Sequence, residues 1–541
     1  MTATNSSSGI VDTLALDEIL SALRQPACYP HHPDQVEMLQ THISAVFLAG
    51  DEVYKLKKPV RFSFLDYSTL ALRQHYCHEE VRLNHRLAPT VYLGVVPLLR
   101  VGTDYHIREV VNMRDATLVD YLVRMRRLPP ERTLAALLAA GEVTKMGIHA
   151  LAKRLVHFHN TAATKDAAIY GAPETVWQAL ADNFHDTAPF VGQTISEKQY
   201  SRIQDFSLSF FREHQTLLQQ RIAQDRVREG HGDLRCDHVY FLDQGISIID
   251  CIEFSPRLRT CDVTSELAFL SMDLELQGAP DLAAELLHAY AVQADDPDLF
   301  RLLPFYQCYR AYVRGKVESL KSQELEVPAE ERERARQQAQ RTFRLAARYA
   351  RGTPPPALIV VCGRVGTGKS TVAQRLSEQT GFIALNSDVI RKRLAGILPT
   401  AHVGAEYRSG IYSEEFSRRT YATLFAQAEE ELRGGRGVIV DATCKQREDR
   451  HTLLELAQRQ QVPVLFLECR ASLGEIERRL RERQRRGDSA SDATWELALR
   501  EQETFPAFDD IPERCLMVIE TEQNMDEGLE AVEERLTERK K

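Results

Sequence analysis

The chain has 541 residues, and at about 150 residues per domain this length predicts roughly two to four domains. Hydrophobic residues at 43% and charged residues at 27% exclude a disordered chain and fit a globular protein. A net charge of −9 argues against a broad nucleic-acid surface, although a local basic groove is compatible with that total.

The cysteine pattern and the start of the chain predict its compartment. The ten cysteines are scattered singly, without a C-x-x-C pair. The first residues lack the basic and apolar regions of a signal peptide, and no apolar stretch approaches the ~20 residues that span a bilayer. We therefore expect a reducing, cytoplasmic setting and no membrane contact.

The N-terminal part begins with β-like segments near 42–57 and 91–110 and then reads as mostly helical, with a β-like interruption at 239–254. Residues 52–58 predict a strand with Lys55 and Lys57 on one face, because successive side chains alternate across a strand. A helix that carries Glu80 follows.

Two carboxylates stand beside neighbouring β-like segments of this part. Asp233 belongs to a His-Gly-Asp triplet at 231–233, and Asp250 follows the apolar pair at 248–249. Such a pair can divide the work of phosphoryl transfer, with one carboxylate positioning the acceptor hydroxyl and the other holding Mg²⁺. Taken alone, the triplet could also be a simple turn.

A composition shift divides the chain. Residues 326–351 are rich in helix formers and alternating charge, and Gly-Thr-Pro-Pro-Pro follows at 352–356. We predict a charged helix and a stiff Pro-rich linker over 326–356, between one domain at 1–325 and another at 357–541.

The C-terminal part alternates strand-like runs with long helical patterns. This order is typical of a doubly wound parallel sheet with helices on both faces. The predicted strands are 358–362, 382–385, 437–440, 462–468 and 515–519.

A phosphate loop follows the first of these strands. Residues 363–370 read Gly-Arg-Val-Gly-Thr-Gly-Lys-Ser, a complete G-x-x-x-x-G-K-[ST] motif. In such a loop backbone N–H groups face phosphate oxygens, Lys369 reaches the β/γ-phosphates and the Ser370 hydroxyl ligates Mg²⁺. We expect ATP and Mg²⁺ as cofactors. The predicted nucleotide-binding residues are Gly363, Arg364, Val365, Gly366, Thr367, Gly368, Lys369, Ser370 and Thr371.

Polar residues follow two further strands of this sheet, and the carboxyl ends of parallel strands face the ligand crevice. Asp388 could accept a proton from an attacking hydroxyl, or cap the helix that it precedes, and the two roles are compatible. Arg391 could hold an anionic group of the acceptor. Asp441 ends an apolar run, where it is the natural partner of the Mg²⁺ water shell.

Arginines are concentrated at 478–488, and Arg479 and Arg483 fall on one helical face. Such a face could close over the phosphates as a lid and stabilise charge on the transferring group. A solvated helix is the alternative, because glutamates are interspersed.

The ordered motifs of the C-terminal part resemble those of the small P-loop kinases related to polynucleotide kinase, gluconate kinase and the zeta toxins, over roughly 357–520. They are the phosphate loop, Ser-Asp-x-x-Arg at 387–391, Asp-Ala-Thr at 441–443 with Arg447 beyond it, and the arginine-rich segment. The resemblance implies that Lys369 and Asp388 are catalytic, with Asp388 as the base. It also implies that Arg391 and Arg447 contact the acceptor and that Arg479 and Arg483 belong to a lid.

The N-terminal motifs resemble the aminoglycoside-phosphotransferase branch of the protein-kinase-like fold, over roughly 35–320. This implies a bilobal domain in which Lys55 pairs with Glu80 and orients phosphates, Asp233 is catalytic and Asp250 binds metal. The whole chain is similar to bacterial two-domain proteins that fuse such a domain to a P-loop kinase. One departure is His238, which stands where the pattern has an Asn ligand of Mg²⁺, although imidazole suits this hard cation poorly.

The sequence therefore predicts an α/β and α+β protein that transfers the γ-phosphoryl of ATP to a hydroxyl of a small-molecule acceptor in the C-terminal domain. Transfer in the N-terminal domain is one alternative, and with His238 that domain could use one metal, recruit Asp237, or have lost transfer and only bind nucleotide. A non-catalytic ATP-binding switch is another alternative. A kinase of nucleic-acid 5′-hydroxyl ends is the third, and the acidic net charge argues against it.

Overall fold

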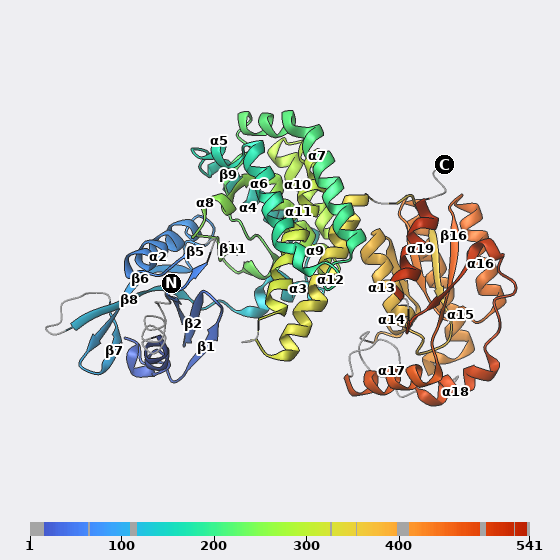
Figure 1. Ribbon diagram of the computed structural model, residues 1–541. Helices are drawn as coiled ribbons and strands as arrows, with labels where there is room; N and C mark the ends of the chain where they lie inside the picture. The colour runs from blue at the N-terminus through green and yellow to red at the C-terminus, as the bar shows by residue number, and fades with distance from the viewer. Residues whose placement is uncertain are drawn as a thin grey trace, which may run out of the picture. The chain divides into compact units, whose positions relative to one another are not determined.

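The computed structural model describes residues 16–62, 65–108, 116–324, 327–352, 354–397, 410–486, 494–523 and 525–537. The chain forms two compact units, one of Met1–Glu197 with Ile203–Thr342 and one of Lys198–Arg202 with Phe343–Lys541 (Figure 1). The division between Thr342 and Phe343 falls within helix α12 (Ala329–Arg351).

The N-terminal unit contains a six-stranded antiparallel sheet in the order β1-β2-β3-β8-β6-β7. Helix α2 (Leu70–Asn84) packs against β6 and β8, and two short strands, β4 (Arg61–Phe62) and β5 (Leu65–Asp66), pair before it. The strands of the sheet are β1 (Val36–Gln40), β2 (Ser44–Ala49), β3 (Glu52–Lys57), β6 (Tyr92–Val101), β7 (Asp104–Ile107) and β8 (Ala116–Arg126).

Strand β8 corrects the expectation that the sequence after residue 110 is mostly helical. It pairs with β3 on one side and with β6 on the other, so it lies inside the sheet. The run Ala-Thr-Leu-Val-Asp-Tyr-Leu-Val-Arg-Met-Arg suits either state, and pairing with two distant strands decides it.

The rest of the N-terminal unit is helical, with α4, α9 and α10 around one hydrophobic core. Two small antiparallel sheets flank the segments around Asp233 and Asp250. One is the hairpin of β10 (Val239–Leu242) and β11 (Gly245–Ile248), and the other pairs β9 (Val227–Glu229) with β12 (Thr260–Asp262). The helices are α3 (Leu134–Ala140), α4 (Lys145–Thr161), α5 (Ala167–Tyr170), α6 (Pro173–Thr187), α7 (Glu197–Ala223), α8 (Pro256–Arg259), α9 (Val263–Leu276), α10 (Pro280–Ala294) and α11 (Leu299–Ser322).

The C-terminal unit is built on a parallel five-stranded sheet in the order β14-β15-β13-β16-β17, which confirms the predicted doubly wound architecture. Each predicted strand is present to within two residues at either end. The strands are β13 (Leu358–Cys362), β14 (Ile383–Asn386), β15 (Val438–Asp441), β16 (Val464–Arg470) and β17 (Leu516–Glu520).

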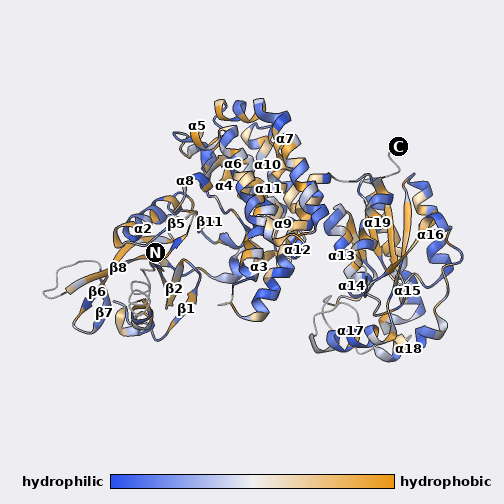
Figure 2. Cartoon of the chain, viewed as in Figure 1, coloured by the Kyte–Doolittle hydropathy of each residue, from blue (hydrophilic) through white to orange (hydrophobic). Residues whose placement is uncertain are grey.

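Helices cover both faces of this sheet because its central strand is apolar on both sides. Leu358 and Val360 of β13 face one cluster with α14 (Ser387–Leu394), α15 (Glu414–Arg433) and α16 (Arg447–Arg459). Ile359 and Val361 face the other cluster, with α13 (Lys369–Thr380) and α19 (Met525–Thr537). Figure 2 shows the apolar strands between helices with polar outer faces. No helix in the described parts of the chain has the length and apolar character to cross a membrane.

Candidate functional site

The loop between β13 and α13 has the backbone that a phosphate loop requires. Gly366 and Gly368 have φ angles of +78° and +89°, which L residues rarely adopt. A Cβ atom on Gly366 would lie 2.7 Å from Ile476 Cγ2, so this position also lacks room for a side chain. Helix α13 begins at Lys369, immediately behind the loop, so the helix N-terminus faces the same space as the loop amides.

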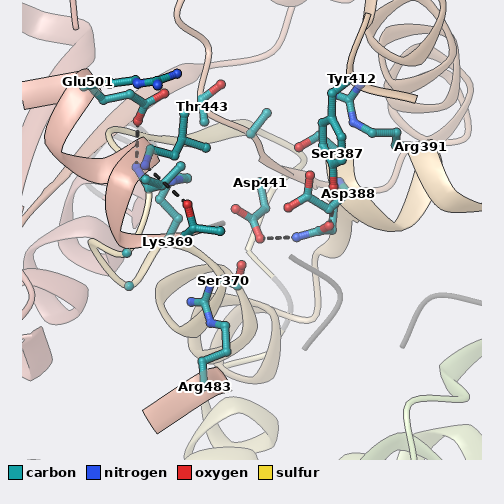
Figure 3. A pocket seen from close by; sticks show the side chains of 18 of the residues that line it. Lys369, Ser370, Ser387, Asp388, Arg391, Tyr412, Asp441, Thr443, Arg483 and Glu501 are labelled. Carbon is teal, nitrogen blue, oxygen red and sulfur yellow. Dashed lines mark hydrogen bonds between the residues drawn. The ribbon is translucent and has the colours of Figure 1, made fainter. Parts of the chain in front are cut away.

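A cavity of about 390 Å³ lies in front of this loop (Figure 3). It is bounded by the loop, by the ends of β14 and β15, and by α14, α17 (Leu473–Arg486) and α18 (Trp495–Thr504). Its described lining residues are Val365, Gly366, Gly368, Lys369, Ser370, Asn386, Ser387, Asp388, Arg391, Tyr412, Tyr421, Asp441, Ala442, Thr443, Arg483, Thr494, Glu496, Leu497, Arg500 and Glu501.

Asp441 lies at the centre of the polar groups of this cavity. Asn386 Nδ2 donates to Asp441 Oδ2 at 2.5 Å, and Ser370 lines the same cavity. Burial raises the pKa of Asp441, while nearby Lys369 and the hydrogen bonds from Ser370 and Asn386 act to lower it. Lys369 Nζ donates to the carbonyl oxygen of Arg364 at 2.8 Å. A cation and a buried carboxylate therefore flank the space in front of the loop.

The oxygen atoms beside the loop suit a magnesium ion. The Ser370 hydroxyl and the carboxylates of Asp441 and Asp388 are hard oxygen donors. Among the described residues no group of three or more His, Cys, Asp or Glu side chains is arranged to hold a metal ion. A magnesium ion here would therefore share Ser370 and Asp441 with phosphate oxygens and water, as Mg²⁺ usually does.

Asp388 lies in the first turn of α14 but does not cap that helix. Asn386 is the N-cap, because its Oδ1 accepts from the backbone N–H groups of Asp388 and Val389 at 2.9 Å each. In Figure 3 the Asp388 side chain lies beside Asp441 in the cavity. The capping alternative is therefore wrong, and the carboxylate lines the cavity next to the proposed metal ligands.

Arg391 is a wall of the cavity and only 7% exposed. Its Nη1 donates to the Ile411 carbonyl at 2.9 Å and to Ser417 Oγ at 3.0 Å, and its guanidinium stands 5.0 Å from the centre of the Tyr412 ring. Its buried Nε has no hydrogen-bond partner among the described residues. These contacts hold the Arg391 side chain in place at the edge of the cavity.

The other predicted arginines are placed differently. Arg483 lines the cavity, whereas Arg447 does not and pairs with exposed Asp509 at 2.7 Å. Arg479 also lies outside the lining and donates to Thr521, whose hydroxyl donates to the Thr367 carbonyl at 2.7 Å. Arg479 thus supports the phosphate loop through Thr521 and does not line the cavity. The end of the predicted arginine-rich segment, 487–488, lies outside the described residues.

Several predicted loop residues shape the cavity without lining it. The Arg364 carbonyl accepts bonds from Lys369 and, at 2.8 Å, from Thr367 Oγ1. Gly363 and Thr367 are buried and do not line the cavity, and Thr371 is exposed on α13. The cavity unites Lys369, Ser370, Asp388, Arg391, Asp441 and Arg483 from distant parts of the sequence.

Glu501 is a lining residue that the sequence does not point to. It is 7% exposed, and its Oε2 accepts from the backbone N–H of Val365 in the phosphate loop at 3.0 Å. The Val365 side chain packs with Ile476 of α17 and Ala498 of α18. The surrounding sequence Arg-Glu-Gln-Glu reads as a solvated helix, so no local signal marks this contact.

A second charged cluster occupies the N-terminal unit. Lys55 Nζ lies 2.9 Å from Glu80, the pairing that the resemblance implies, and also 2.9 Å from Asp250. Lys57, which is fully buried, bonds to Glu80 at 2.6 Å and to Glu253. Lys55 and the nearby imidazoles hold the pKa of Asp250 far below its usual range, against the effect of burial.

The His-Gly-Asp triplet forms a loop that buried Glu266 holds through the backbone N–H groups of His231 and Gly232. Arg235 Nε lies 3.1 Å from each carboxylate oxygen of Asp233. Burial acts to raise the pKa of Asp233, but Arg235 and His238 hold it below its usual range. Lys55 thus contacts both Glu80 and Asp250, and His238 lies near both Asp233 and Asp250, whereas the roles of these residues stay predictions.

Comparison with known proteins identifies relatives along most of the chain. Residues 358–507 match the family model of an AAA domain. The uncharacterized protein Rv2004c of Mycobacterium tuberculosis (strain ATCC 25618 / H37Rv) is 30% identical over 466 residues, which is 86% of this chain and 89% of that protein. The uncharacterized protein Mb2027c of Mycobacterium bovis matches to the same extent. The chain belongs to the family of these mycobacterial proteins.

Solved structures resemble about a third of this family member. A putative kinase from Chloroflexus aurantiacus is 20% identical and has a TM-score of 0.27, with 33% of this chain and 98% of that chain covered. A gluconokinase from Sinorhizobium meliloti is 20% identical with a TM-score of 0.25, and 35% of this chain and 100% of that chain are covered.

Proposed function

We propose that the protein is an ATP-dependent phosphotransferase that moves the γ-phosphoryl group of ATP to a hydroxyl of a small molecule in the C-terminal cavity. The observation that carries this proposal is the convergence of the phosphate loop with Ser370, Asp441 and Asp388 around one cavity. The AAA-domain match over the same residues supports nucleotide binding there.

We assign each side chain of the cavity a separate role in the reaction. Lys369 leaves the Arg364 carbonyl and bonds to the phosphates, together with the loop amides. Ser370 and Asp441 would hold Mg²⁺, which would supply positive charge to neutralise the charge that develops on the phosphates. The oxygen of the acceptor hydroxyl bonds to the γ-phosphorus, and Asp388 accepts the proton that this hydroxyl loses. The bond between that phosphorus and the β–γ bridging oxygen breaks, and ADP leaves.

The acceptor side of the cavity favours a small polar molecule. Hydroxyl groups of Ser387, Thr443 and Tyr421 line it, and Tyr421 and Thr443 are 3.1 Å apart. The Arg391 guanidinium also lines this side and would favour an anionic group of the acceptor. The chain's net charge of −9 makes a nucleic-acid 5′ end the less favoured acceptor.

The Lys55–Glu80 pair with Asp250 supports a second candidate, phosphoryl transfer in an N-terminal unit of the aminoglycoside-phosphotransferase, protein-kinase-like type. In this candidate Lys55 orients phosphates and Asp233 accepts the proton. Arg235 already neutralises Asp233, so an acceptor would have to displace part of that contact.

Acceptor-dependent ADP release tests the proposal. Purified full-length protein with MgATP is screened against pooled sugars, sugar phosphates, nucleosides and hydroxy acids. A phosphotransferase releases ADP faster with at least one pool, and Asp441→Asn removes this gain. A slow release that no pool changes would contradict phosphotransfer and favour the regulatory ATP-binding switch.

A further inference from the structure

His238 lies between the two key carboxylates of the N-terminal unit. It is 8% exposed, its Nδ1 lies 2.8 Å from the carbonyl oxygen of Asp233, and its Nε2 lies 3.8 Å from Asp250 Oδ2. The resemblance to kinase-like proteins implies Mg²⁺ at this point, with an amide oxygen where His238 stands. A nitrogen ligand does not fit that ion, which prefers oxygen.

The hydrogen bonds of His238 fix which ring nitrogen has a lone pair. A carbonyl oxygen can only accept, so Nδ1 carries the hydrogen and donates to Asp233. Nε2 therefore has the lone pair and faces Asp250. A metal-ligating histidine is usually oriented in this way, by a bond from its other ring nitrogen to a carbonyl or carboxylate.

The separation of the two ligand atoms suits a single ion. Ligand atoms at about 2.1 Å from a transition ion can be at most ~4.2 Å apart, and are ~3.0 Å apart at a right angle. The 3.8 Å between Nε2 and Asp250 Oδ2 lies inside this range. The other oxygen of Asp250 is held by Lys55 at 2.9 Å, so the carboxylate is oriented as well.

One hydrogen bond of His238 competes with the binding of an ion. Arg235 Nη2 donates to the same Nε2 lone pair at 3.0 Å. An ion must displace this bond, while Arg235 keeps its bonds from Nε to Asp233. With two protein ligands and this competition, the ion needs further oxygen atoms, which a nucleotide phosphate would supply.

We propose that His238 and Asp250 form a site for a divalent first-row transition ion of the Mn²⁺ type, selected over Mg²⁺ by the imidazole nitrogen and completed by nucleotide phosphates and water. The proposal rests on the second candidate function, nucleotide binding by the N-terminal unit. It goes beyond that candidate because it assigns an ion that differs from the Mg²⁺ of the C-terminal cavity.

Pulsed electron paramagnetic resonance on full-length protein with Mn²⁺ and ADP tests the site, because it detects an imidazole nitrogen bound to the ion. No histidine is among the described residues that line the C-terminal cavity, and loss of the signal in His238→Asn is what assigns it to the N-terminal unit. We expect imidazole modulation in the wild type and its loss in His238→Asn and in Asp250→Asn. We also expect the preference for Mn²⁺ over Mg²⁺ to fall by at least ~10-fold in His238→Asn.

The matched control is His42→Asn, since His42 is exposed and pairs with Glu324 far from Asp250 in the sequence. This variant should keep the modulation. Bound Mn²⁺ and ADP without imidazole modulation would overturn the site and leave the C-terminal phosphotransferase standing. Absence of any bound Mn²⁺ with ADP would overturn both, and loss of the modulation in His42→Asn would assign the nitrogen to another residue.

Discussion

The phosphate-loop cavity of the C-terminal unit and the charged cluster of the N-terminal unit differ in the partners of their cationic side chains. Lys369 donates to a backbone carbonyl, and nearby Asp441 has a raised pKa because it is buried. Lys55, Lys57 and Arg235 each contact one or two carboxylates. The first site can thus take an anionic ligand by exchanging a neutral partner, whereas the second must break ion pairs to do so.

The largest expected effect concerns the ion pairs that build the N-terminal site. Lys57→Met should lower the free energy of unfolding by about 3–5 kcal/mol, because buried Glu80 and Glu253 lose a charged partner. Urea unfolding measures this change. Lys145→Met is the control, since Lys145 is 75% exposed, and it should change stability little. Equal stability of Lys57→Met and wild type would show that the ion pairs of Lys57 do not stabilise the N-terminal site, and would contradict this comparison.

Phosphoryl transfer should depend on a carboxylate of the C-terminal cavity. Asp388→Asn should lower kcat/KM by at least ~100-fold, about 3 kcal/mol, while ATP affinity stays near that of the wild type. Steady-state ADP release with the identified acceptor and calorimetry with MgATP measure the two quantities. Asp509→Asn is the control, because Asp509 is exposed and lies outside the cavity lining. Unchanged turnover in Asp388→Asn would exclude Asp388 as the base.

Acid should weaken the loop that carries Asp233. Burial acts to raise the pKa of Glu266, but His159 and two backbone N–H groups lower it to about 2. Because the folded pKa is depressed, this stabilisation is present above about pH 4.5, the unfolded value, and is lost as the pH falls toward 2. The loss is on the order of 3 kcal/mol.

Urea unfolding between pH 5 and about pH 3 measures this dependence. Glu266→Gln should flatten the decline in stability with falling pH, whereas Glu330→Gln, on the exposed part of α12, should keep it. A decline of the same slope in Glu266→Gln and wild type would show that another carboxylate carries the effect.

The smallest expected effect compares two glycines with similar backbones. Gly366→Ala should weaken MgADP binding by roughly 10-fold, because its Cβ would meet Ile476 at 2.7 Å and shift the phosphate loop. Gly396 has φ +69°, and no atom of the described residues lies within 4 Å of an added Cβ, so we expect Gly396→Ala to add mainly backbone strain and to leave affinity unchanged. Calorimetry compares the two, and equal affinities would mean that the loop tolerates the shift.

Contiguous patterns account for what the sequence predicts well. Each strand of the C-terminal sheet is a short apolar run, and the phosphate loop occupies eight consecutive residues, 363–370. Asp388 and Asp441 follow strand ends, where the geometry of a parallel sheet brings them to one crevice. The pairing of Lys55 with Glu80 comes instead from resemblance.

Contacts between distant segments account for what the sequence does not predict. β8 is a strand because β3 and β6 pair with it. Arg479 reaches Thr521, 42 residues away, and through it supports the phosphate loop. Glu501 bonds to Val365, 136 residues away. The composition of a short segment does not predict contacts between residues so far apart in the sequence.

Transfer of label from γ-labelled ATP to a metabolite pool tests most directly whether the C-terminal cavity performs the chemistry. Wild type, Lys369→Ala and Asp233→Ala are compared side by side at equal concentration. We predict that Lys369→Ala loses transfer by at least ~100-fold, because one phosphate-binding cation is removed, and that Asp233→Ala retains it. Full transfer by Lys369→Ala together with loss in Asp233→Ala would contradict the account and move the reaction to the N-terminal unit.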